Sequence, residues 1–140
     1  MAVFTYNVRN LDAAVRRLLD RHRDVRHTAM LQVADFLRGE AQRRCPVDEG
    51  NLTNDIHGDT EINQKSEAAC VYVPVNAPSA KYAIPMHEHF YNLGENSKAK
   101  QGKVDVTVGR EYLTRAITEN MDEIRRRIMF TLHRETERNA

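Results

Sequence analysis

Hydrophobic residues recur at intervals of three and four along the first third of the chain. The positions that keep this spacing are Leu11, Val15, Leu18, Leu19, Val25, Ala29, Met30, Val33, Phe36, Leu37 and Ala41. Such a stripe is typical of the buried face of an amphipathic helix, and neither Pro nor Gly interrupts residues 11–38. The pattern predicts one helix over residues 11–44, with Asn10 as its N-cap. A break near the polar "RHRDVRH" is the alternative.

Three short segments have the composition of strands. Residues 3–8, "VFTYNV", are β-branched and aromatic and suit a strand or an extended arm. After the predicted helix, "LTNDIHGDTEI" and "AACVYVPV" are separated by the polar "NQKSE". We expect these two segments to form an antiparallel hairpin with a loop of medium length.

The stretch "CPVDEGNLTNDI" lies between the helix and the hairpin. Pro46 ends the helix, because it lacks an amide donor and disfavours helical geometry in the residue before it. Asp48 can accept amide hydrogen bonds in an Asx-type turn, and Gly50 allows a positive φ. Leu52 and Ile56 are expected to begin the apolar face of the first strand. The prediction is a structural corner, made by Pro46, Asp48, Gly50, Asn51 and Leu52.

The second half of the chain ends in another helical pattern. The segment "AKYAIPMHEHFYNLG" is predicted to be extended or irregular, and residues 92–103 are polar, contain two glycines and predict a long exposed loop. A second amphipathic stripe predicts a C-terminal helix. Its members are Leu113, Ala116, Ile117, Met121, Ile124, Ile128 and Leu132.

These elements predict an α+β fold in a single domain over residues 1–140, with a small antiparallel β-sheet packed against a long N-terminal helix and a C-terminal helix. The chain has 41% hydrophobic residues, no Trp and a mean hydropathy of −0.65. Its core should therefore be modest, and we expect partner subunits to contribute to stability and to cover the edges of the short sheet.

Charge and targeting signals narrow the class of protein. The 21 basic and 20 acidic residues nearly cancel, so net charge does not favour a nucleic-acid or membrane partner. No apolar run approaches the roughly 20 residues that span a bilayer, and the start "MAVFTYNVRN" lacks the layout of a secretion signal. We expect a protein made in the cytoplasm, with no membrane partner.

Candidate catalytic and metal-binding residues are few. If the segment is extended, His87 and His89 share one face, but a zinc site needs a third protein ligand, which His57 or Cys70 could supply only through tertiary contacts. Without a CxxC pair, Cys45 and Cys70 are expected to be two reduced cysteines, the first more exposed and the second in the core. We predict no catalysis and no cofactor. A small metal- or thiol-dependent enzyme using these residues remains an alternative.

Most of the basic residues are Arg, and they cluster on both predicted helices. The clusters are Arg16, Arg17, Arg21, Arg23 and Arg26, and Arg125, Arg126 and Arg127. Acidic residues interleave at helical pair spacing, which favours ion-paired, solvated faces over phosphate binding. A regulatory DNA-binding domain is the weaker alternative.

The order of four segments resembles one protein family. "RRCPVDEGNLTNDI", the hairpin, "KYAIPMHEHFYNLG" and "VGREYLTRAITENMDEIRRRI" are similar to the neck or tail-completion proteins of lambda-like tailed phages, the gene-product-ten-like tail components that join head to tail. The similarity covers roughly residues 12–130. The residues that match the family pattern are Pro46, Asp48, Gly50, Asn51, Leu52, Tyr82, Ala83, His87, Glu88, Gly94, Tyr112, Leu113 and Ala116. Glu49 replaces a usual Thr, and "HFYNLG" with a long polar loop replaces a compact turn.

The resemblance implies a structural virion protein. Such proteins form a homo-oligomeric ring, here expected to be a hexamer or dodecamer, assembled in the host cytoplasm and placed at the head–tail junction. The ring would contact a head-closure or connector protein and a tail terminator or tail tube protein, and DNA would pass through it without sequence-specific binding. The candidate subunit and partner contacts are His87, Glu88, His89, Tyr91 and Gly94.

Overall fold

A computed structural model describes residues 2–8, 17, 23–47, 50–62 and 67–138. It contains a sheet of three antiparallel strands, β1 (Ala2–Val8), β2 (His57–Ile62) and β3 (Glu67–Pro74), in the order β1-β3-β2. The pairs include Tyr6 with Val71 and Gly58 with Val71. The predicted hairpin and N-terminal strand are confirmed, and the two edge positions are taken by β1 and β2.

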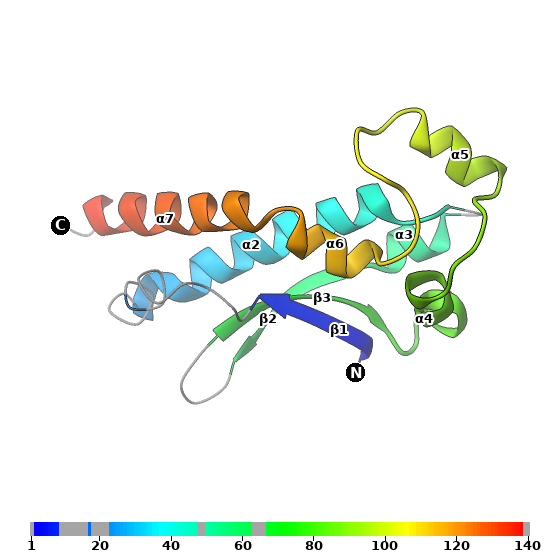
Figure 1. Ribbon diagram of the computed structural model, residues 1–140. Coiled ribbons are helices and arrows are strands. Elements are labelled where there is room, and N and C mark those ends of the chain that lie inside the picture. Colours follow the sequence, from blue (N-terminus) through cyan, green and yellow to red (C-terminus); the bar gives the residue numbers. More distant parts are fainter. Residues whose placement is uncertain (1, 9–16, 18–22, 48–49, 63–66, 139–140) are drawn as a thin grey trace.

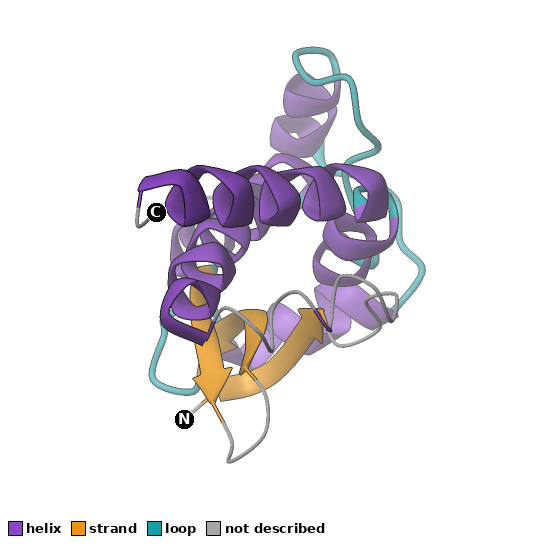
Figure 2. Cartoon of the chain, turned by 90° about the vertical axis from the view of Figure 1, so that its left-hand side faces the viewer, coloured by secondary structure: helices purple, strands orange, loops and turns teal. Residues whose placement is uncertain are grey.

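Six helices pack with this sheet in the described part of the chain (Figure 1). They are α2 (Arg23–Arg44), α3 (Asn51–Asp55), α4 (Ala80–Glu88), α5 (Glu95–Gln101), α6 (Tyr112–Thr118) and α7 (Met121–Arg138). Helix α2 lies on the sheet, and α7 runs along α2. A view turned by 90° shows the strands on one side and the long helices on the other (Figure 2). The predicted α+β fold class is confirmed.

The core forms where α2 meets the sheet and the C-terminal helices. Both hydrophobic stripes predicted from the sequence face inward at this contact. Their buried members include Ala29, Met30, Val33, Leu37, Ala41, Leu113, Ala116, Ile124, Ile128 and Leu132. From the sheet, β3 contributes Ala69, Val71 and Val73, each with no exposed surface. Every second residue of β3 therefore points into the core.

One glycine sets how closely α2 can approach the sheet. A Cβ built on Gly58 of β2 would lie 2.4 Å from the backbone oxygen of Ala34 and 3.0 Å from its carbonyl carbon. Real Cβ atoms do not come so near to backbone atoms. Helix α2 and strand β2 are in contact at a point where only a glycine fits.

Three predicted elements differ from the structure. Residues 51–55 form helix α3, so the first hairpin strand begins at His57 and not at Leu52. Residues 80–88 form helix α4 despite Pro85, and 95–101 form helix α5, so the predicted irregular segment and exposed loop are largely helical. The C-terminal stripe is divided between α6 and α7 by a break at residues 119–120.

Some predictions fall on other parts of the chain. Helix α2 ends at Arg44, just before Pro46, as predicted. Asn10, most of residues 11–22 and Asp48 lie outside the described residues, so the continuity of the predicted helix 11–44 and the role of Asp48 stay predictions. Of the helices that are described, none has the length and apolar character needed to cross a membrane.

Candidate functional site

The corner after α2 is built around a left-handed glycine. Gly50 has φ 86° and ψ −3°, and its carbonyl accepts a hydrogen bond from the Asn54 amide at 3.1 Å, which closes the first turn of α3. Two side chains of α2 bind the carbonyls of this corner. Gln42 Nε2 donates to Thr53 O at 3.2 Å, and Arg38 Nε donates to Ile56 O at 3.1 Å. The positive φ predicted for Gly50 is confirmed, and the corner is fastened to α2.

Gly50→Val is expected to lower the free energy of unfolding by about 2 kcal/mol, because a β-branched residue resists positive φ. Space is not the obstacle, since the nearest atom to a Cβ there is Asn54 Nδ2 at 4.0 Å. Gly50→Asn is the matched control, because Asn tolerates the left-handed region, and it should cost less. Thermal melting of the variants would measure this, and an unchanged curve for the Val variant would contradict the turn.

Helix α5 is held against the end of α2 by two polar side chains. Ser97 Oγ accepts a hydrogen bond from the Val47 amide at 2.8 Å and donates to the Val47 carbonyl at 3.0 Å. The Lys100 ammonium donates to the Cys45 carbonyl at 2.6 Å and also to the Gln42 carbonyl. A cation at this place interacts favourably with the C-terminal end of a helix dipole, although burial lowers the pKa of Lys100.

A groove lies between the corner, α4 and α5. Its volume is about 710 Å³. Its walls are formed by Pro46, Val47, Gly50, Asn51 and Leu52 from the corner, by Pro78, Lys81, Tyr82 and Met86 from α4 and the turn before it, and by Gly94, Glu95, Asn96 and Ser97 from α5. We call it the α3–α4–α5 groove. It brings together two sequence segments that carry the family-like motifs, although they are far apart in the chain.

His87 is buried between α4 and α6. Its Nδ1 lies 2.9 Å from Glu88 Oε1, and its Nε2 accepts a hydrogen bond from the Thr114 amide at 3.3 Å. The ring meets Tyr112 edge-on at 5.0 Å between centroids, and the His87 carbonyl accepts from the amide of Glu111 at 2.7 Å. Because a backbone amide donates to Nε2, the neutral ring carries its proton on Nδ1. His87 thus joins α4 to the start of α6 inside the protein.

Burial lowers the pKa of His87 below its ordinary value of 6.5, and the carboxylate of Glu88 opposes this only in part. Below about pH 6.5 the unfolded chain therefore binds this proton more readily than the folded chain. As the pH is lowered through this range, the free energy of unfolding should decrease, by at most about 1.4 kcal/mol per pH unit. The loss ends once the pH passes below the folded-state pKa.

Thermal melting of His87→Gln between neutral and acidic pH is the measurement, because a Gln oxygen can accept from the Thr114 amide and does not titrate. We expect a shallower loss of stability than in the wild type over the window below pH 6.5. Equal slopes for the wild type and His87→Gln would contradict this account.

The segment after α4 alternates between inward and outward side chains. Tyr91 turns inward and its hydroxyl donates to the Met86 carbonyl at 2.6 Å, while burial raises the pKa of Tyr91 to about 12. Phe90 points outward and is 87% exposed. Among the predicted contact residues, Glu88, His89 and Gly94 are exposed, Tyr91 is half-buried and His87 is buried. His87 therefore acts inside the fold and offers little surface to a partner.

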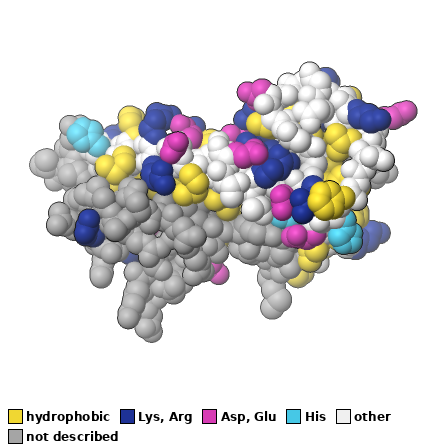
Figure 3. Space-filling view, viewed as in Figure 1, with side chains coloured by type: hydrophobic (Ala, Val, Ile, Leu, Met, Phe, Trp, Pro, Cys, Tyr) yellow, Lys and Arg dark blue, Asp and Glu magenta, His cyan; other side chains and the backbone are white. Residues whose placement is uncertain are grey.

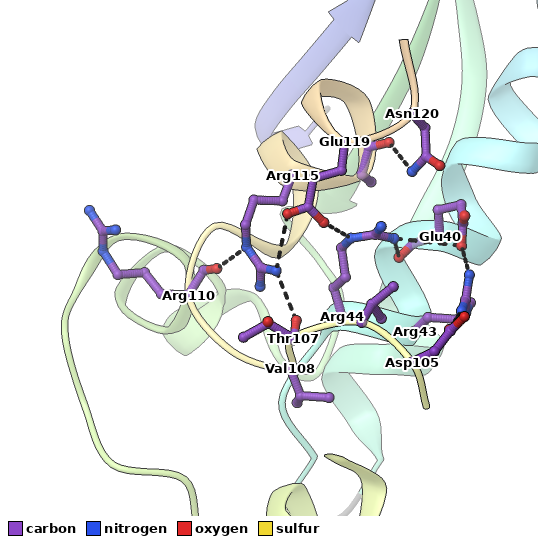
Figure 4. Close-up of polar contacts among 12 residues, drawn as sticks. Glu40, Arg43, Arg44, Asp105, Thr107, Val108, Arg110, Arg115, Glu119 and Asn120 are labelled. Carbon is purple, nitrogen blue, oxygen red and sulfur yellow. Dashed lines mark hydrogen bonds and ion pairs between the residues drawn. The ribbon is translucent and has the colours of Figure 1, made fainter. Parts of the chain in front are cut away.

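A buried arginine clasps the loop before α6 to the end of α2 (Figure 4). Arg44 is 2% exposed, its Nε donates to Glu119 Oε1 at 2.9 Å, and one guanidinium nitrogen donates to the Glu40 carbonyl at 2.9 Å. The Arg44 carbonyl accepts from the Gly109 amide at 2.8 Å. From the other side, Arg115 donates to the carbonyls of Thr107 and Arg110. Through Arg115 this network also holds the backbone of Arg110, whose guanidinium lies over the Phe90 ring.

The residues behind the enzyme alternative do not form one site. His87 is buried and the adjacent His89 is exposed, so they do not share a face. Cys45 is fully buried, contrary to the predicted exposure, and burial raises its pKa to about 12. The thiol is therefore protonated at neutral pH. Both cysteines are free, Cys70 is buried as predicted, and the described residues include no group of three that could hold a metal ion.

The arginine cluster of α7 is paired with acidic residues. Arg125 lies 2.9 Å from Asp122, while Arg126 and Arg127 lie 2.6 and 2.8 Å from the carboxylate of Glu123. Exposed pairs at this spacing support a helix weakly. They are consistent with the ion-paired face that the sequence favours over a phosphate-binding one.

Comparisons with protein-family models, with curated proteins and with solved structures found no match.

Several residues of the site escaped sequence reasoning. Ser97 and Lys100 sit in a mostly polar stretch, and Arg44 is one of many arginines, so none of these three positions differs from its neighbours in the sequence. A signal for α4 was present, because Ala83 and His87 are four residues apart and both are buried. Pro85 lies between them, and a proline inside a segment argues against a helix.

Proposed function

We propose that this protein is a ring-forming structural component of a tailed-phage neck, which joins the head to the tail around the DNA channel. The observation that carries the proposal is the convergence of the two motif-bearing segments, 46–52 and 82–94, on the α3–α4–α5 groove. The order of the segments along the chain suggested the family, and their meeting at one surface groove supports the proposal.

The character of the surface supports assembly. Three large apolar side chains from different elements, Phe90, Phe130 and Val75, are 87%, 60% and 50% exposed. Basic and acidic side chains lie interleaved over the middle of one face (Figure 3). Such a face suits close packing between copies better than binding to a polyanion. Strands β1 and β2 also offer edges that a neighbour could cover.

Particle composition tests the proposal. Virions of the phage that encodes the chain would be purified on a density gradient and their proteins quantified by mass spectrometry. We expect the protein in intact particles at a fixed small number of copies, and we expect a deletion phage to accumulate filled heads and separate tails. Absence of the protein from infectious particles would overturn the proposal.

A further inference from the structure

Phe90 is the most exposed large hydrophobic residue of the described chain. It directly follows the C-cap of α4, His89, whose backbone is extended with φ −88° and ψ 151°. An exposed ring of this size is costly in water, and aromatic residues are enriched among the side chains that dominate protein interfaces.

The ring of Phe90 is held in position from two sides. The Arg110 guanidinium lies over it, 4.1 Å from the centroid, and Arg110 Nε donates to the Glu88 carbonyl at 3.1 Å. The next residue, Tyr91, is anchored through its hydroxyl to Met86. Tyr91 is thus turned inward, and its neighbour Phe90 is turned outward. A side chain ordered before binding loses less entropy when it binds. We call Phe90 with Arg110 the Phe90 knob.

The α3–α4–α5 groove is suited to such a ring. Leu52, Tyr82 and Met86 supply apolar surface inside it, and the volume of about 710 Å³ is ample for an aromatic side chain. Met side chains adapt to aromatic rings and make favourable contacts with them. Phe90 does not line this groove in its own chain.

Charges at the two surfaces are complementary in one orientation. The groove carries exposed Lys81 on its α4 wall and exposed Glu95 on its α5 wall. The knob carries Arg110 above the ring, and Arg110 also lies 3.4 Å from the carboxylate of Glu111. Docking that brings Arg110 to Glu95 pairs opposite charges, whereas docking that brings Arg110 to Lys81 brings like charges together.

We propose that the Phe90 knob of one copy inserts into the α3–α4–α5 groove of a second copy of this chain. Knob and groove are formed by different residues. Where the second copy offers its own knob to the groove of a third, the contact is heterologous and repeats from copy to copy. Such contacts close into a ring when the rotation allows it. The biological role of this contact rests on the proposed ring function, which it deepens by naming the subunit interface.

Photo-cross-linking tests the contact while keeping an aromatic ring at position 90. Phe90→p-benzoylphenylalanine protein would be mixed at millimolar concentration with isotope-labelled wild-type protein and irradiated, and the covalent dimer would be digested and analysed by mass spectrometry. We expect the link to join position 90 to labelled peptides containing Met86 or Leu52. The matched control, Phe130→p-benzoylphenylalanine on α7, should give no link to the groove.

A second variant changes the groove in the isotope-labelled copy. Glu95→Lys in that copy should lower the yield of the Phe90 cross-link about tenfold, because it places a cation opposite Arg110. Asp35→Lys, the same charge change at an exposed position of α2 outside the groove, should leave the yield unchanged. No covalent dimer, a link outside the groove, or a yield unaffected by Glu95→Lys would each overturn the proposal.

The two proposals fail in different ways. Absence of the protein from virions would remove the neck function and would not alter the cross-link in solution. A ring present in the virion, without a Phe90 cross-link to the groove, would remove only this interface.

Discussion

Gly58→Ala is expected to lower the free energy of unfolding by about 3 kcal/mol, which is about 10 °C in melting temperature for a chain of this size. The added Cβ would lie 2.4 Å from the Ala34 carbonyl oxygen. That atom belongs to the backbone of α2 and cannot move alone. Relief requires β2 to separate from α2, which opens the contact that buries Val33 and Leu37.

Gly39→Ala is the matched control, measured by the same urea and thermal unfolding curves. Gly39 lies within α2, and nothing is within 4 Å of a Cβ built there. Ala favours a helix over Gly, so this variant should gain about 0.5–1 kcal/mol. A Gly58→Ala protein as stable as the wild type would show that α2 and β2 are not packed as described.

Arg44→Met is expected to cost about 3 kcal/mol, because it removes a buried cation and leaves carboxylates without it. Arg44 is 2% exposed and binds both Glu119 and the Glu40 carbonyl. Arg43 still neutralises Glu40, and Glu119 is partly exposed and can be rehydrated. Because both carboxylates keep a partner or water, the expected loss lies at the lower end of the roughly 3–5 kcal/mol that breaking a buried ion pair costs.

The same substitution at an exposed arginine separates charge from burial. Arg126→Met removes an ion pair with Glu123 on the outer face of α7, where the arginine is 70% exposed. Its effect on the unfolding midpoint should be small, because surface pairs contribute little. Equal losses of stability for Arg44→Met and Arg126→Met would mean that the contacts of Arg44 do not connect α2 to α6.

Elements with a clear hydrophobic period could be predicted from the sequence. The stripe of α2, the hairpin of β2 and β3 and the C-terminal stripe bury an apolar face, and burial repeats at the period of the backbone. The corner was also predictable, since Pro46 cannot continue a helix and only a residue such as Gly50 easily adopts φ 86°.

The remaining elements depend on contacts between distant residues. Leu52 and Ile56 fit a strand or a helical turn equally well, and the side chains of Arg38 and Gln42 decide for the turn by binding its carbonyls. Helix α5 has no apolar stripe and is held by Ser97 and Lys100. The groove exists only because these contacts bring α5 to the corner, so no local pattern could reveal it.

A cryo-electron microscopy map of the virion neck tests the central claim most directly, because it reports the subunits, their symmetry and their neighbours together. The account predicts a closed ring of identical α+β subunits around the DNA channel, between the head-closure layer and the tail. A neck that is fully interpreted by other proteins, with no density that fits α2 packed on the β1-β3-β2 sheet, would contradict it.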